Sequence, residues 1–114
     1  MSASPRRWTF LTNHGHTLVC IARDPDARLR DIAERVGITE RAAQTIVADL
    51  VAEGYLVRHR VGRRNRYEVV HGRPMRHALV AGSAVGDVLD ALDAVPAGGA
   101  KAQSAPSLRR PASA

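Results

Sequence analysis

A chain of 114 residues is long enough for one globular domain and too short for two domains that each bury a core. It has no run of about 18 apolar residues, which argues against a membrane-spanning helix, and its one cysteine excludes an intramolecular disulfide and favours a cytoplasmic location. Seventeen basic residues against eleven acidic ones give a net charge of +6, which favours a nucleic acid or an anionic surface as the partner.

The two ends of the chain differ in composition from the middle. Residues 96–114 are mostly Ala, Pro, Gly and Ser without an apolar period, and we expect them to form a disordered tail. Residues 1–7 are expected to form a flexible arm, and the first candidates for packing after it are Trp8, Phe10 and Leu11. The ordered part is therefore expected between them, as a domain over residues 8–78 followed by a helix within residues 79–95.

A first helix is predicted after Thr12 or Asn13, since either side chain can cap its amino end. It should end at Asp24, because Pro25 disfavours a helical residue before it. The apolar residues of this helix are Leu18, Val19, Ile21 and Ala22. Residues 28–30, Arg-Leu-Arg, are interpreted as a short extended piece.

Two further helices are predicted on either side of a sharp turn. The first covers residues 31–36 and ends in the turn Gly37-Ile38, and the second begins at Thr39, whose side chain can cap it. This second helix runs to Glu53 with apolar residues three and four apart, and Gly54 ends it. Its apolar residues are Ala43, Ile46, Val47 and Leu50.

Beyond Gly54 the sequence changes from a helical period to alternation. Residues 55–61 and 66–70 predict two strands of a hairpin, joined by the turn residues 62–65. Alternation along the strands then predicts which side chains face the core. The inward set is Val57, Val61, Tyr67 and Val69, and the outward set is Arg58, Arg60, Arg66 and Glu68.

The last predicted element is a helix that ends before Pro96. Its apolar residues recur at helical spacing and are Val85, Val88, Leu89, Leu92 and Val95. The stripe of Val85, Val88, Leu89 and Leu92 is a candidate dimer interface, to which Trp8 and Phe10 would add. The alternative is that this helix only covers its own domain.

The order of these elements indicates a fold. Helix, short strand, helix, tight turn, helix and hairpin in succession make a winged helix-turn-helix, a mainly α fold of the α+β class with a three-helix core, a β-hairpin wing and an additional C-terminal helix. The segment LRDIAERVGITERAAQTIVADLVAEGYLVRHRVGRRNRYEV, residues 29–69, resembles the DNA-binding domain of MarR- and ArsR-type bacterial transcription regulators. The resemblance implies a regulator that binds double-stranded DNA at the nucleoid, and terminal helices that serve to form a homodimer.

The third predicted helix is the element expected to read the DNA sequence. A helix fits the major groove, where Arg can pair with guanine and Gln with adenine, and where small residues allow close approach to thymine methyl groups. The residues expected to face the DNA are Thr39, Arg41, Ala42, Gln44, Thr45 and Ala48. In isolation these would be ordinary solvated residues, and the surrounding elements are what favour recognition.

Charge separates the third helix from the hairpin. Residues 39–54 carry a net charge of −2 and residues 55–76 a net charge of +6, so the hairpin is expected to supply the attraction to the DNA backbone or minor groove. The residues expected to do so are Arg58, Arg60, Arg63, Arg64, Asn65 and Arg66. A charged edge that prevents pairing between molecules is the alternative, although five arginines exceed that need.

Other functions have little support in the sequence. No Gly-rich phosphate loop, nucleophile motif or carboxylate pair indicates an enzyme. The five histidines lack the spacing and the cysteine partners of a metal site, so no metal and no cofactor are expected, and Cys20 is expected to be a buried, inert thiol. Two alternatives stay open: a winged-helix module that binds another protein and, ranked lower, an RNA binder, because Tyr67 is the hairpin's one stacking candidate and is expected to face inward.

Overall fold

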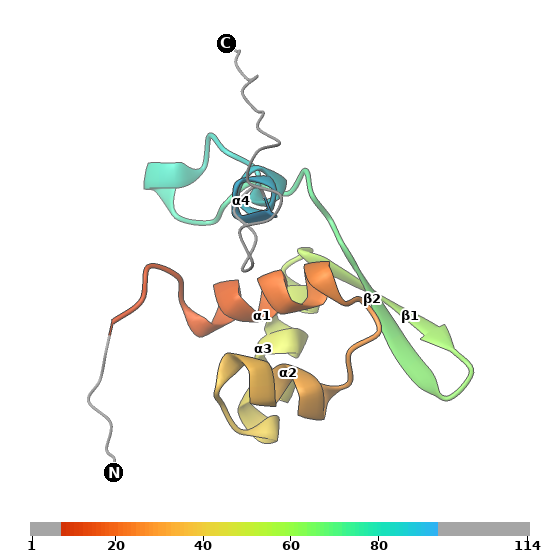
Figure 1. Ribbon diagram of the computed structural model, residues 1–114. Helices are drawn as coiled ribbons and strands as arrows, with labels where there is room; N and C mark the ends of the chain where they lie inside the picture. Colours follow the sequence, from red (N-terminus) through yellow and green to blue (C-terminus); the bar gives the residue numbers. More distant parts are fainter. Residues whose placement is uncertain (1–7, 94–114) are drawn as a thin grey trace. The chain divides into compact units, whose positions relative to one another are not determined.

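The computed structural model describes residues 8–93, which belong to two compact units (Figure 1). The first unit ends at Val69 and the second begins at Val70. The expected flexible arm at residues 1–7, the expected tail at 96–114 and the last two residues of the expected C-terminal helix lie outside the described residues. Within residues 8–93, no helix is long and apolar enough to cross a membrane.

The first unit consists of three helices and a hairpin. The helices are α1 (Asn13–Arg23), α2 (Leu29–Val36) and α3 (Glu40–Ala52), and the strands β1 (Leu56–Val61) and β2 (Arg64–Val69) pair antiparallel. The three helices pack against one another, β1 packs on α3 and β2 packs on α1. The most deeply buried large side chains are Ile21, Ile32, Val47 and Leu56. These elements confirm the predicted fold class.

The first helix begins and ends where the sequence predicts. The hydroxyl oxygen of Thr12 accepts the backbone N–H of Gly15 at 3.1 Å, which satisfies one of the free donors at the amino end of α1. The helix stops at Arg23, and Asp24, which precedes Pro25, has a non-helical backbone.

The extended piece predicted at residues 28–30 is wrong, because α2 begins at Leu29. Arg28 is its cap residue, and the Arg28 backbone N–H donates to the Asp31 carboxylate at 3.3 Å. Residues 25–27, just before the helix, do not pair as a strand either, since Pro25 has no N–H and the N–H of Ala27 donates to the carbonyl of Asp24 at 3.0 Å. This loop forms one backbone hydrogen bond with β2, from the N–H of Tyr67 to the carbonyl of Pro25 at 3.2 Å.

The turn between α2 and α3 forms at Gly37, as predicted. Gly37 has a φ of 88°, a left-handed conformation that side chains disfavour, and its N–H donates to the carbonyl of Ala33 at 2.8 Å. Thr39 then caps α3 by accepting the N–H of Ala42 at 3.0 Å. At the other end, the N–H groups of Gly54 and Tyr55 close the helix on the carbonyls of Val51 and Leu50.

The hairpin, which we call the wing (residues 56–69), has a tighter turn than predicted. Only Gly62 and Arg63 separate the strands, and Gly62 supplies the positive φ, 62°, that a two-residue turn needs. The pairing places Arg58 opposite Tyr67 and Leu56 opposite Val69. Opposite residues share a face of the hairpin.

The pairing of the wing contradicts the prediction for two of the four residues that were expected to face the core. Tyr67 and Val69 face the core side, as expected, but Val57 and Val61 are exposed on the opposite face. A turn with an even number of residues pairs odd positions of one strand with even positions of the other. Leu56 therefore takes the buried place in β1, and Arg58 lies on the same face as Tyr67.

The second unit contains a short 3₁₀ helix, η1 (Ala78–Val80), and the helix α4 (Val85–Asp93). The chain before α4 folds back on itself, with Pro74 bridged to Ala84 and the N–H of Met75 donating to the carbonyl of Ser83 at 3.0 Å. Within the range 79–95 that was expected to contain the C-terminal helix, α4 begins at Val85. Of its apolar stripe, Val85 and Leu89 are buried within one chain, and Val88 and Leu92 are half-buried.

Candidate nucleic-acid interface

Helix α3 presents one exposed face along most of its length. Arg41, Gln44, Thr45 and Ala48 are all exposed and follow one another at spacings of three, one and three residues, so they share a side of the helix. The other side is fixed by the burial of Ala43, Ile46, Val47 and Leu50 in the core. The structure therefore brings four of the six predicted reading residues together.

The other two predicted residues of α3 have structural roles. The hydroxyl oxygen of Thr39 is occupied as the cap of the helix, and Ala42 is half-buried. One of the two acidic groups on the helix itself is also engaged, because the Asp49 carboxylate lies 2.8 Å from Nε2 of His14 in α1. The part of the exposed face nearest the amino end, Arg41 to Thr45, carries no such contact among the described residues.

The arginines of the wing point to both of its faces. Arg58 lies over the ring of Tyr67, with its guanidinium carbon 5.9 Å from the ring centre. Arg60 bonds back to the turn, donating from Nε to the carbonyl of Gly62 at 3.2 Å. Arg63 at the tip is exposed and contacts no partner within residues 8–93. Arg58 and Arg66, which alternation predicted to face the same way, therefore lie on opposite faces of the hairpin.

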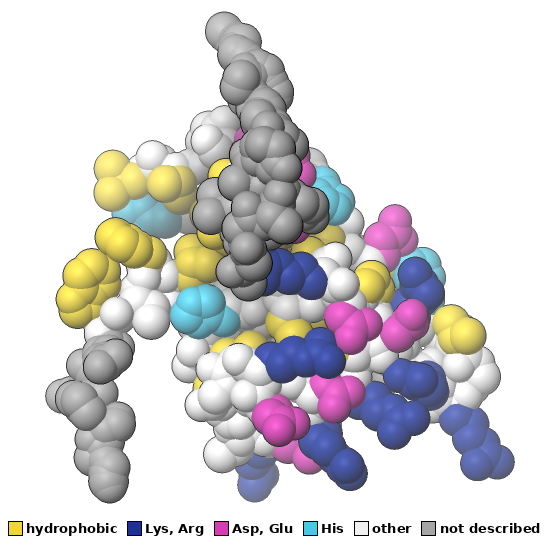
Figure 2. All heavy atoms as spheres, in the orientation of Figure 1, with side chains coloured by type: hydrophobic (Ala, Val, Ile, Leu, Met, Phe, Trp, Pro, Cys, Tyr) yellow, Lys and Arg dark blue, Asp and Glu magenta, His cyan; other side chains and the backbone are white. Residues whose placement is uncertain are grey.

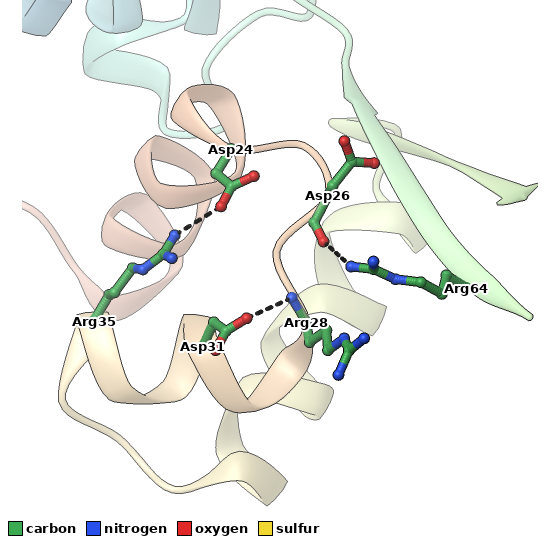
Figure 3. Close-up of polar contacts among 6 residues, drawn as sticks. All are labelled: Asp24, Asp26, Arg28, Asp31, Arg35 and Arg64. Carbon is green, nitrogen blue, oxygen red and sulfur yellow. Dashed lines mark hydrogen bonds and ion pairs between the residues drawn. The ribbon is translucent and has the colours of Figure 1, made fainter.

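Arg64 and Arg66 both reach across to Asp26 in the loop between α1 and α2. Arg64 donates from Nη2 to the backbone carbonyl of Asp26 at 2.6 Å (Figure 3). Arg66 forms an ion pair with the Asp26 carboxylate, at 3.2 Å from Nη1 to Oδ2. Both side chains of this pair are more than half exposed, so water and other anions can compete for Arg66.

Basic side chains gather over α2 and the wing (Figure 2). Arg28 and Arg30 were not among the predicted DNA contacts, because residues 28–30 were expected to form an extended piece. Both are exposed, and Figure 3 shows the Arg28 side chain turned away from Asp31. The signal that could have found them is Asp31, three residues after Arg28, which is the position of a carboxylate in a capping box.

A second group of polar residues lies between α1 and α2. Arg35 of α2 forms an ion pair with Asp24 at 3.1 Å, and this hydrogen bond to the carboxylate, with a smaller contribution from Cys20, raises the pKa of the Arg35 guanidinium. Arg35 also lines an open cavity of about 370 Å³, together with His16 and the buried Cys20. No cluster of three or more metal-ligating side chains occurs in the described part of the chain.

Comparison with known proteins adds one match. A family model described as the MarR family matches residues 10–66, which is half of the chain. The matched segment begins just before α1 and ends within β2, so it contains the helix-turn-helix and most of the wing. No curated protein matches the chain.

Proposed function

The chain belongs to the MarR family of winged-helix, DNA-binding transcription regulators, and on that premise we propose that it recognises a specific sequence of double-stranded DNA. The observation that carries this proposal is the exposed face of α3, made by Arg41, Gln44, Thr45 and Ala48. A helix of this kind fits the major groove, and arginine and glutamine are the side chains that pair bidentately with guanine and adenine.

The wing supplies the charge that α3 lacks. Phosphate contacts position a protein on DNA without reading its sequence, and each one contributes to affinity by releasing condensed counterions. Arg63 at the tip is free to make such a contact, and Arg64 and Arg66 are held beside it by Asp26. We expect this part of the protein to bind backbone phosphates or to enter the minor groove.

The regulator is proposed to act as a homodimer. One module of this size contacts a short stretch of DNA, and two modules related by a twofold axis read half-sites about one helical turn apart. The half-buried residues Val88 and Leu92 of α4 are the proposed contact between the two copies. Trp8 and Phe10, which are 76% and 91% exposed and packed edge to face at 5.0 Å, are proposed as further dimer contacts.

Selection of bound duplexes from a random pool tests the proposal. The wild-type protein should enrich one sequence motif, and Arg41→Ala or Gln44→Ala should weaken binding to that motif by about 1–3 kcal/mol and relax the preference at particular base pairs. The matched contrast is the double substitution Arg63→Ala and Arg64→Ala. It should weaken binding to selected and random duplexes alike, with little change in the selected motif.

Two results would contradict this assignment. An unchanged motif in both α3 variants would mean that another surface reads the sequence. Unchanged affinity and salt dependence in the wing variant would remove the wing from the DNA interface. In that case the exposed Val57 and Val61 on the outer face of the wing would favour a protein partner instead.

A further inference from the structure

An open cavity lies where the start of α2 meets the wing. Its volume is about 270 Å³, and three arginines line it: Arg28 from the cap of α2, and Arg63 and Arg64 from the wing. Asn65 and Tyr67 of β2 contribute the other polar side chains, and the remaining lining residues are Ala27 and Leu29. The lining therefore holds three positive charges and no carboxylate.

The nearby acidic groups are already engaged. The carboxylate of Asp26 is paired with Arg66, and that of Asp31 accepts the backbone N–H of Arg28. Arg64 gives one of its N–H groups to the carbonyl of Asp26 and keeps its other donors. The guanidinium of Arg28 contacts no partner within residues 8–93, and Figure 3 shows it on the side of α2 where Arg64 also lies.

From this arrangement we infer that the cavity binds one phosphate group, held jointly by Arg28 of the helix-turn-helix and Arg63 and Arg64 of the wing. Planar guanidinium groups match phosphate oxygens better than any other side chain. The volume lies below the roughly 300–1,000 Å³ of pockets that enclose a whole small molecule, which favours a single group of a larger ligand. The four residues 28, 63, 64 and 65 are exposed, so that ligand can extend away from the protein.

The ligand is assigned as a backbone phosphate of duplex DNA, which rests on the proposed function. Arg28 then joins the residues that contact DNA. One phosphate would be bound by residues from two elements, so the wing and the helix-turn-helix would hold their relative position at the same point of the backbone.

Salt titrations with a short duplex of random sequence test the shared phosphate. Arg28→Ala should weaken binding roughly tenfold, the equivalent of one charged hydrogen bond, whereas Arg30→Ala, which removes the same charge from α2 outside the cavity, should weaken it much less. If Arg28 and Arg64 hold the same phosphate, the double substitution should flatten the slope of log affinity against log salt by about 0.9 in total. Two separate phosphates would give about 1.8.

Either of two results with this duplex overturns the inference while leaving the proposed function intact: equal effects of Arg28→Ala and Arg30→Ala, or a slope change near 1.8 in the double variant. If the wild-type protein binds no duplex at all, the proposed function fails, and NMR titration with inorganic phosphate decides about the cavity. Shifts of the Nε–H signals of Arg28 and Arg64, absent for Arg30, would support a phosphate site. Unmoved signals would overturn it.

Discussion

Asp26 is the residue on which the wing arginines converge, through its carbonyl with Arg64 and its carboxylate with Arg66. A carboxylate beside a surface meant for phosphate has two opposing effects. It holds the arginines in place, and it competes with the DNA for their charge. Because the pair with Arg66 is more than half exposed, its contribution to folding is about 0.2–1 kcal/mol, and the competition should dominate.

Asp26→Asn should therefore increase the affinity for random-sequence DNA, by up to about fivefold if a pair of 1 kcal/mol is released. The dependence on salt should become steeper, since Arg66 is then free to contact a phosphate. Fluorescence anisotropy with labelled duplex at several salt concentrations measures both quantities.

Asp24→Asn is the matched control for this prediction. Asp24 lies two residues away in the same loop and is also paired with an arginine, but its partner is Arg35 of α2. An increase in DNA affinity that reflects only the loss of one negative charge would be the same in the two variants. An Asp26→Asn variant that binds no better than Asp24→Asn would show that the Asp26 carboxylate does not compete with DNA.

The position of α3 depends on the turn at Gly37. A Cβ added there would meet no atom within 4 Å, so a substitution acts through the backbone alone. At a φ of 88°, any other L-residue is strained by about 1–2 kcal/mol. Gly37→Ala should lower the stability by that amount, which in a domain of this size lowers Tm by several degrees.

Gly72→Ala gives the comparison for the turn. Gly72 also has open space around its Cβ position, and its φ is not positive, so alanine should be tolerated with little change in Tm. Thermal unfolding followed by circular dichroism measures both variants. Equal melting temperatures for the two variants would mean that alanine at position 37 does not strain the backbone as expected.

The sequence predicts the elements whose signals are local. The caps at Thr12 and Thr39, the turn at Gly37 and the exposed face of α3 all follow from residues within one or two helical turns of each other, and each forms as expected. The start of α2 was missed because Arg28-Leu29-Arg30 has no apolar period, while the bond that fixes its cap involves Asp31.

The part of the site that could not be predicted is made by contacts that are distant in sequence. Asp26 meets Arg64 and Arg66 about forty positions later, and only the folded wing brings them together. The facing of the arginines depends on the number of residues in the turn at Gly62, where a difference of one would exchange the two faces. Composition shows that the wing is basic, and register decides which arginines meet the loop.

The burial of α4 determines which of its residues can be substituted to test for a dimer. Leu89 is 8% exposed within one chain, so a charge there would disturb the fold itself. Val88→Glu with Leu92→Glu places charges at half-buried positions instead. Light scattering should find a dimer for the wild type and a folded monomer for this variant, with much weaker binding to the selected DNA.

Asp87→Asn with Asp90→Asn serves as the control on the exposed side of the same helix and should leave the dimer intact. A monomeric wild-type protein at the concentrations used for DNA binding would exclude this interface. A dimer that persists in the Val88 and Leu92 variant would place the contact elsewhere, with Trp8 and Phe10 as the next residues to substitute.

Because the N–H of Tyr67 donates to the carbonyl of Pro25, hydrogen exchange at this amide reports whether the wing is in contact with the loop between α1 and α2. This N–H points away from β1, so in the native protein it exchanges with solvent deuterium only when the wing leaves the loop or the domain unfolds. Asn65 directs its N–H to the same side of β2, where residues 8–93 offer it no partner, and it should exchange freely. The ratio of the two exchange rates therefore measures how often the wing lifts from the helices, in the free protein and on DNA.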